Sequence, residues 1–313
     1  MSVPILVIGS SNTDMMVKAR RLPKAGETVM GKSFLMNPGG KGANQAVTAS
    51  RLGGSVKFIS KVGNDIFGKQ AIKQFEREKI DTSFIFTDTD SPSGVALINV
   101  DQNGENSIMV APGANDNLSI EDVDKALDNI EAPYIVLLQL EIPLNTVEYA
   151  IEYCSSKKLQ IILNPAPAVE LNESILKSLS FITPNESEAE LLTGIKITDI
   201  ASAKKAAERI YLKGVPNVVI TLGVRGAYIH NNEISKLIPA PLVTAKDTTA
   251  AGDCFNGSLA VALSEGMPVE EAVSFACKSA SIAVTRIGAQ SSLPYRKEVN
   301  EIRLSVGIQS TSK

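Results

Sequence analysis

The sequence predicts an α/β fold in which helices flank a central, mostly parallel sheet, with a small β-sheet lid added to it. Short apolar runs of strand length alternate with helical patterns along most of the chain, which is typical of parallel sheets covered by helices. Two N-terminal segments break this alternation. Residues 14–37 carry no helical pattern, and residues 94–110 predict two strands around a turn.

The predicted elements follow from apolar patterning and from helix caps. Ile5–Ile8 is an apolar run that ends at Gly9, as a buried strand does. Asp65 is expected to cap the helix that runs to Phe75, and Asn145 to cap a helix with Val147, Ala150, Ile151 and Cys154 on one face. The other predicted elements are a helix over residues 42–51 and strands over residues 56–63, 134–143, 159–164, 179–185 and 217–223.

The lid is expected within a single domain. Asn103-Gly104 is a hairpin signal between the two strands of residues 94–110. Since no linker divides the chain, we expect residues 1–313 to form one domain with lid strands inserted at about 14–37 and 94–110. A layer of this kind often closes over a ligand.

Composition excludes several classes of partner. The 313 residues include 31 basic and 34 acidic side chains, so there is no basic excess to bind nucleic acid. We find no apolar run near the ~20 residues that cross a bilayer, and no secretion signal. Three scattered cysteines argue against a disulfide framework or a zinc site. These features predict a cytoplasmic protein that binds neither nucleic acid nor membrane.

Two glycine-rich segments differ in how strongly they indicate a ligand-binding site. Residues 26–33, GETVMGKS, match the phosphate-loop pattern, but no buried strand precedes them and Pro38 leaves little room for a following helix. That match is attributed to chance or to the lid. In residues 37–46, NPGGKGANQA, the glycines allow close backbone approach to a ligand. Lys41 and Asn44 would donate from the first turn of the next helix, although a flexible loop is the alternative.

Polar side chains follow several strands at the sheet edge where ligands bind in open parallel sheets. Asp14 accepts hydrogen bonds only and suits a pair of neighbouring hydroxyls, whereas Asn12 and Asp14 could equally form a turn. Glu141 ends an apolar strand whose other polar residue is Gln139, and a carboxylate there is costly unless it is paired.

Two later segments could face a nucleotide. Asn185 and Glu188 could hold water around magnesium, or they could form a capping box with the same spacing. The turn from Thr221 to Gly226 could admit a base or phosphates, or could merely be tight. We interpret His230, the single histidine, as structural or exposed.

The segment 247–253, DTTAAGD, carries the strongest chemical signal. Ala250, Ala251 and Gly252 have almost no side chains, so their N–H groups can approach an anion at the positive end of the following helix. A transferring phosphoryl group needs such donors, and Asp253 adds a carboxylate beside it. A plain helix cap is the alternative, but a cap does not need three small residues before it.

The motifs NPGGKGANQA and DTTAAGD together resemble the two signature segments of the ribokinase-like sugar kinases. GSSNTD, QLEIP, TPNESEAE, TLGVRGA and AVTRIGAQSSLP resemble other segments of that family in the same order, so the resemblance runs nearly end to end. It implies a kinase that uses ATP, Mg²⁺ and K⁺ to phosphorylate D-ribose at O5. The exposed edge of the predicted lid separately suggests pairing with a second copy, so we expect a homodimer through the lid.

The resemblance also implies residue roles. Asp253 would be the general base, Ala250, Ala251 and Gly252 the anion hole, and Gly39-Gly40 the lid hinge. The residues at or beside the sugar would be Asn12, Thr13, Asp14, Gly40, Lys41, Gly42, Ala43, Asn44, Glu141 and Asp253. Those near ATP would be Asn185, Thr221, Leu222, Gly223, Val224, Arg225, Gly226, Gly252, Asp253 and Cys277, with Glu188 near magnesium. The monovalent cation would bind Asp247, Thr249, Ala283, Arg286, Gly288 and Ser292.

Two alternatives remain at this stage. The substrate could be another small sugar, with deoxyribose the nearest because it lacks one hydroxyl. The chain could instead be a non-catalytic sugar sensor on the same scaffold, since fold alone does not fix function. The presence of Asp247, Gly252 and Asp253 together argues against a sensor.

Overall fold

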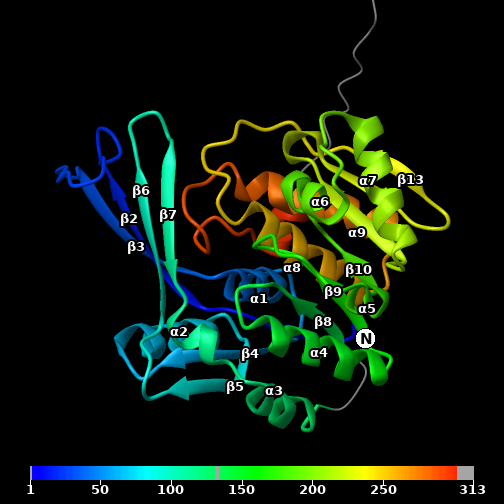
Figure 1. Ribbon diagram of the computed structural model, residues 1–313, viewed down its shortest axis with the longest axis horizontal. Helices are drawn as coiled ribbons and strands as arrows, with labels where there is room; N and C mark the ends of the chain where they lie inside the picture. Colours follow the sequence, from blue (N-terminus) through cyan, green and yellow to red (C-terminus); the bar gives the residue numbers. More distant parts are fainter. Residues whose placement is uncertain (1, 131–133, 302–313) are drawn as a thin grey trace, which may run out of the picture.

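The computed structural model describes residues 2–130 and 134–301, so the remaining residues of the predicted 1–313 unit lie outside the description. It confirms the predicted fold class (Figure 1). The main sheet has the order β13-β12-β11-β10-β9-β8-β1-β4-β5, parallel from β5 to β11, with β12 and β13 antiparallel at one edge. Its strands are β1 (Ile5–Ile8), β4 (Val56–Gly63), β5 (Asp81–Asp88), β8 (Ile135–Leu138), β9 (Gln160–Leu163), β10 (Phe181–Ile182), β11 (Asn217–Thr221), β12 (Ala227–His230) and β13 (Ser235–Ile238).

Alternation along the strands builds a separate core on each face of the sheet. Ile5 and Val7 point into one core and Leu6 and Ile8 into the other, and all four are fully buried. The first face is covered by α1 (Lys41–Arg51), α2 (Ile66–Arg77), α8 (Ala251–Ser264), α9 (Val269–Ala283) and α10 (Arg296–Glu301). The second is covered by α3 (Ile120–Leu127), α4 (Leu144–Ser156), α5 (Glu173–Lys177), α6 (Glu186–Thr193) and α7 (Ile200–Leu212).

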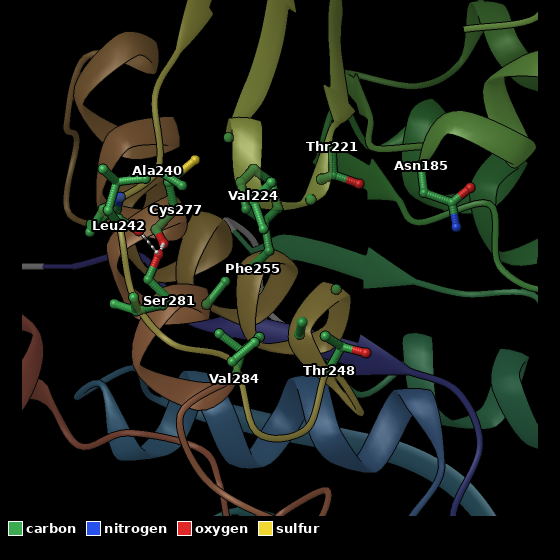
Figure 2. A pocket seen from close by; sticks show the side chains of 18 of the residues that line it. Asn185, Thr221, Val224, Ala240, Leu242, Thr248, Phe255, Cys277, Ser281 and Val284 are labelled. Carbon is green, nitrogen blue, oxygen red and sulfur yellow. Dashed lines mark hydrogen bonds between the residues drawn. The ribbon is translucent and has the colours of Figure 1, made fainter. Parts of the chain in front are cut away.

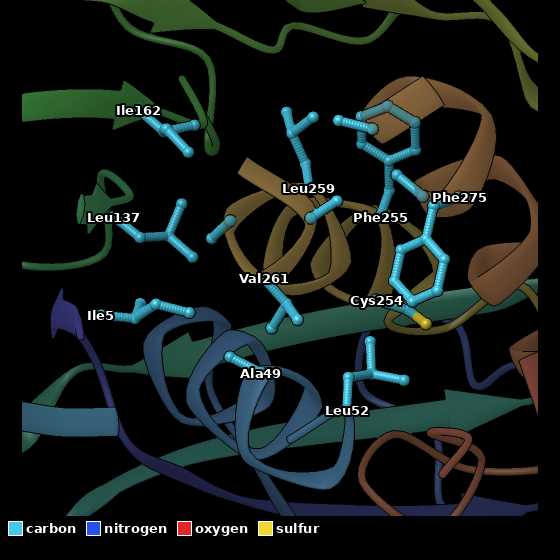
Figure 3. Close-up of a cluster of buried hydrophobic side chains, with 14 of the residues drawn as sticks. Ile5, Ala49, Leu52, Leu137, Ile162, Cys254, Phe255, Leu259, Val261 and Phe275 are labelled. Atoms are coloured by element: carbon cyan, nitrogen blue, oxygen red, sulfur yellow. The ribbon is translucent and has the colours of Figure 1, made fainter. Parts of the chain in front are cut away.

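The first core brings two helices that matter for the site into close contact. Figure 3 shows α8 lying over the sheet, with Leu259 and Val261 among the side chains of Ile5, Leu137 and Ile162. Gly257 of α8 lies against α1, where an added Cβ would come within 2.6 Å of the Gln45 carbonyl oxygen. A glycine is therefore needed at this crossing, and it sets how closely the first turns of α1 and α8 approach.

The lid is a second sheet of four strands that projects from the body of the molecule (Figure 1). Its order is β3-β2-β6-β7, formed by β2 (Asn12–Lys18), β3 (Ser33–Gly39), β6 (Gly94–Val100) and β7 (Asn106–Ala111). These bounds extend the strands expected within 14–37 by two residues at each end. Gly104, at φ 85°, lies between β6 and β7 where the hairpin was expected.

Several boundaries differ from the sequence expectations. The Asn145 cap was wrong, because α4 begins at Leu144 with Pro143 at the N-cap, which places Asn145 inside the helix. The Asp65 cap is confirmed, since its side chain accepts from Gly68 N. The strand expected over 134–143 ends at Leu138, after which Leu140 N bonds to Ala166 O and the chain leaves the sheet. Within the described residues, no helix is both long and apolar enough to cross a membrane.

Candidate active site

Asp253 lies in the first turn of α8 and is bonded by the first turns of α1. Its Oδ2 accepts from Asn44 Nδ2 at 2.9 Å and its Oδ1 from Gln45 Nε2 at 3.1 Å. The side chain is only 7% exposed. Burial raises the pKa of Asp253, while Lys41 and the two amide donors oppose that rise. A carboxylate held in this way is poised to accept a proton, because its basicity exceeds that of an exposed aspartate.

Glu141 and Lys41 form a half-buried pair beside Asp253. Glu141 Oε2 accepts from Ser10 Oγ at 2.7 Å and from Lys41 N at 3.0 Å, and its Oε1 lies 3.7 Å from Lys41 Nζ. Burial alone would lower the pKa of Lys41, but the charges of Asp253 and Glu141 raise it. The lysine therefore stays cationic between two carboxylates, and the costly charge at Glu141 is compensated.

Asp14 faces the same group of charges from the base of the lid. Burial, Glu141 and Asp253 raise the pKa of Asp14 to about 7, with Lys41 opposing them. Its carboxylate lies against Gly39, where a Cβ would come within 2.2 Å of Oδ1. Asn12 is held nearby, because its Oδ1 accepts from Asn115 Nδ2 at 2.7 Å. Asn115 had no signal in the sequence, yet its side chain also accepts from Ser11 N and donates to Pro112 O, so it links the start of β2 to the segment that follows β7.

The backbone before α8 differs in one respect from the predicted anion hole. Ala250 adopts the left-handed conformation at φ 59°, which turns the chain into the helix. The N–H of Ala251 already donates to Thr248 O at 3.2 Å, so it is not a free donor as expected. The N–H groups of Gly252 and Asp253 make no hydrogen bond within the described residues, and Gly252 faces open space. The positive end of α8 is thus presented mainly by these two residues.

A cavity of about 540 Å³ opens from this helix end (Figure 2). Of the residues predicted to lie near ATP, the following line it: Asn185, Thr221, Gly223, Val224, Gly226, Gly252 and Cys277. Leu222 instead packs in the core at 2% exposure, and Arg225 pairs with Glu186. The segment Ala240–Val243, Phe255 and Ser281 also line the cavity, and no pattern in the sequence had indicated them as nucleotide contacts.

Asn185 and Glu188 form a capping box at the start of α6. Asn185 Oδ1 accepts from Glu188 N at 2.9 Å, and Glu188 Oε2 accepts from Asn185 N at 2.8 Å. Burial raises the pKa of Glu188. The sequence left a cap and a magnesium contact as alternatives, and the cap is present. Within the part of the chain that the structure describes, no cluster of three acidic, histidine or cysteine side chains could hold a metal.

Asp247, predicted to bind a monovalent cation, contacts two other residues of the predicted set. Its Oδ1 accepts from Thr249 N and its Oδ2 from Gly288 N, both at 2.9 Å. Burial opposes ionisation, but these hydrogen bonds outweigh it and lower the pKa of Asp247. Ser292 is fully buried, Ala283 ends α9, and Arg286 pairs with Glu298. The set offers mainly oxygen donors, which suits a hard cation.

His230 takes no part in this site. It ends β12, its Nδ1 lies 2.9 Å from Ser235 Oγ, and its ring packs edge-on against Tyr211. The structural interpretation of the histidine therefore agrees with its position. Thr13 borders a separate cavity between the lid base and α2, while Gly42 and Ala43 are buried against β1 and the core.

Comparison with known proteins agrees with this geometry. The model of the pfkB family of carbohydrate kinases matches residues 4–296. The chain belongs to the pfkB carbohydrate kinase family. Two relatives in this family are the ribokinase of Haemophilus influenzae, 43% identical over 95% of this chain and 97% of the relative, and the deoxyribokinase of Salmonella typhi, 39% identical over the same shares.

A solved structure in the family has the same architecture. The ribokinase of Arabidopsis thaliana, complexed with ribose and ATP, superposes with a TM-score of 0.85 at 31% identity, covering 96% of this chain and 98% of that chain. This likeness extends over both the main sheet and the lid. The family membership identifies this protein as a carbohydrate kinase, and the polar cluster of Asp14, Lys41, Glu141 and Asp253 beside a cavity of about 540 Å³ agrees with it.

Proposed function

We propose that the protein transfers the γ-phosphoryl group of ATP to O5 of D-ribose, giving ADP and D-ribose 5-phosphate. The observation that carries the proposal is the position of Asp253. It lies where the polar group of Asp14, Lys41 and Glu141 meets the helix end that opens into the large cavity. The ribokinase relatives support ribose as the sugar.

The described residues supply the steps of this reaction. Asp253 accepts the proton of the O5 hydroxyl as that oxygen attacks the γ-phosphorus, and the bond from phosphorus to the bridging oxygen of ADP breaks. The free N–H groups of Gly252 and Asp253 stabilise the charge on the transferred group. The N–H of Ala251 can donate to the transferred group only if its hydrogen bond to Thr248 O breaks.

The two substrates have distinct places. Asp14 accepts from two neighbouring hydroxyls of the sugar, and Asn12, Lys41, Asn44 and Glu141 contact the others. ATP occupies the cavity, with its phosphates at Gly252 and its base towards Cys277. The apolar and backbone groups from Thr221 to Gly226 border the nucleotide.

Two metal ions complete the proposal. Mg²⁺ would neutralise phosphate charge; we expect it to be held chiefly by the nucleotide and water, with Glu188 nearby, because both Glu188 oxygens already bond to Asn185. K⁺ would bind at Asp247 and Ser292 with backbone oxygens of Thr249, Ala283, Arg286 and Gly288, and would steady the loops on either side of Asp247. Their oxygen-rich donor set supports this assignment.

We further propose that the protein works in the cytoplasm as one domain that forms a homodimer through its lid. The lid exposes large apolar side chains, including Phe34 at 60%, Ile108 at 56% and Met109 at 71%. Exposed apolar side chains on a sheet with free edges favour pairing with a second copy. A monomeric mass by light scattering at micromolar concentration would contradict the dimer.

The deciding experiment measures ADP formation with ribose, with and without potassium. Ribose-dependent ADP release is expected from the wild type, with a strong loss when potassium is replaced. Asp253→Asn should keep the fold and ribose binding while turnover falls by orders of magnitude. Ribose binding without any ADP formation would instead favour the sensor.

Deoxyribose is the second candidate substrate, because a deoxyribokinase relative is 39% identical. The two sugars differ by one hydroxyl, which Asp14 would recognise. A sugar panel in the same assay separates them: kcat/KM for ribose should exceed that for deoxyribose by 10-fold or more, since a buried carboxylate loses a partner. Equal kcat/KM values for the two sugars would show that the enzyme accepts both ribose and deoxyribose.

A further inference from the structure

A buried chain of amides lies beneath Asp253. Gln45 is fully buried in α1 and uses both of its amide hydrogens, donating to Asp253 Oδ1 at 3.1 Å and to Asn164 Oδ1 at 3.0 Å. Its own Oε1 accepts from Nε2 of the fully buried Gln139 at 2.7 Å. The resemblance assigned no role to Gln45, Gln139 or Asn164.

These contacts fix which way the Gln45 amide points. If the amide were flipped, its oxygen would face the carboxylate oxygen of Asp253 and the carbonyl oxygen of Asn164, which repel it. Its NH₂ group would then face the NH₂ group of Gln139. Gln139, which follows β8, supports this orientation by donating to Gln45 Oε1, so that a donor faces Asp253.

A second branch of the same network holds the residue before Asp253. Asn164 Nδ2 donates to Thr183 O at 3.4 Å, and Thr183 Oγ1 donates to Asn256 Oδ1 at 2.6 Å. Asn256 Nδ2 then donates to Gly252 O at 2.9 Å. The ends of β8, β9 and β10 thus hold two adjacent residues in the first turn of α8, one by its carboxylate and one by its carbonyl.

We propose that Gln45 is a positioning residue for the general base, and that Gln139 acts through Gln45 by fixing its amide orientation. This inference rests on the proposed role of Asp253. Gln45 holds Oδ1 of Asp253 in place and favours the ionised carboxylate, so that its proton-accepting form is populated at neutral pH. Removal of that donor should make Asp253 harder to ionise as well as less well oriented.

The test compares Gln45→Leu and Gln139→Leu with the wild type. Gln45→Leu should lower kcat about 10- to 100-fold, the factor expected for one lost hydrogen bond to a charged group, with KM for ribose within about twofold. The acidic limb of the pH profile should move up by about one unit. Gln139→Leu keeps the direct contact and should show the same changes at about 3- to 10-fold.

Controls separate positioning from folding. Ser60→Ala removes a fully buried hydroxyl that has no partner within the described residues, and it should leave kcat and the pH profile unchanged. Circular dichroism and thermal melts establish the folded fraction of each variant. A loss of kcat with an unmoved pH midpoint in both glutamine variants would show a purely structural role and overturn the proposal.

A double-mutant cycle separates failure of this inference from failure of the proposed function. In the Asp253→Asn background, Gln45→Leu should reduce turnover no further, because Gln45 acts through the carboxylate. Fully additive losses would overturn the positioning role while leaving Asp253 as the base. A wild type that forms no ADP with ribose, or an active Asp253→Asn variant, would refute the proposed function instead.

Discussion

Ribose binding should depend on pH through Asp14. Binding requires the ionised carboxylate, since that form accepts two hydroxyl hydrogens, and the pKa of Asp14 in the free protein is about 7. The ionised fraction is then about one-tenth at pH 6 and about nine-tenths at pH 8. The dissociation constant for ribose should therefore fall about tenfold from pH 6 to pH 8 and level off above that.

Isothermal titration calorimetry without nucleotide measures this directly. Titrations at pH 7 in buffers of different ionisation enthalpy should also show release of about half a proton per ribose bound. Asp14→Asn should bind ribose weakly and without this pH dependence. In Asp253→Asn the midpoint should move to lower pH, because a like charge that raises the pKa of Asp14 is removed. A dissociation constant that stays within twofold across this range, with no proton released, would refute the reasoning.

Three further predictions concern side chains at the same site. Gly252→Ala should keep the melting temperature but raise KM for ATP about tenfold or more, because its added methyl enters the open space where we propose that the phosphates bind. Normal ATP kinetics would place the phosphates elsewhere. Gly42→Ala should destabilise the fold by about 1–3 kcal/mol in urea unfolding, because its Cβ would come within 2.6 Å of Ser10 N; unchanged stability would contradict that packing. Asp14→Asn should raise the melting temperature at pH 8 but not at pH 4. The pKa of Asp14 is higher in the folded protein than in the unfolded chain, so the wild type loses stability as pH rises from the unfolded pKa to the folded pKa, by up to about 4 kcal/mol before solvent screening. An equal rise in melting temperature at both pH values would exclude ionisation of Asp14 as the cause.

The sequence predicts the fold class well because its signals are local. Apolar runs place most strands of the main sheet, and Asn103-Gly104 places the hairpin of the lid. Helix boundaries are less predictable, as at Asn145, because a residue type that often caps a helix can also lie in its first turn. The backbone conformation of the preceding residues decides between the two positions. In α4, Pro143 occupies the N-cap position, so the helix begins at Leu144.

The residues of the candidate site also differ in how far the sequence alone could predict them. Asp253 and Gly252 belong to a contiguous segment whose composition is unusual, so they could be singled out. Gln45 and Asn164 could not, since they meet across 119 positions of sequence and each is an ordinary amide in its own segment. Gln139 gave a partial signal as a polar residue in an apolar strand. Its partner is known only once α1 is packed against the sheet.

The three cysteines offer an internal probe of local opening. Burial raises the thiol pKa of Cys154, Cys254 and Cys277 to about 12, so alkylating reagents should find almost no thiolate in the native molecule. Cys154 belongs to the core on one face of the main sheet, and the other two belong to the core on the opposite face. The order in which mass spectrometry detects their labelling in mild denaturant would therefore show whether one side of the sheet loosens before the other.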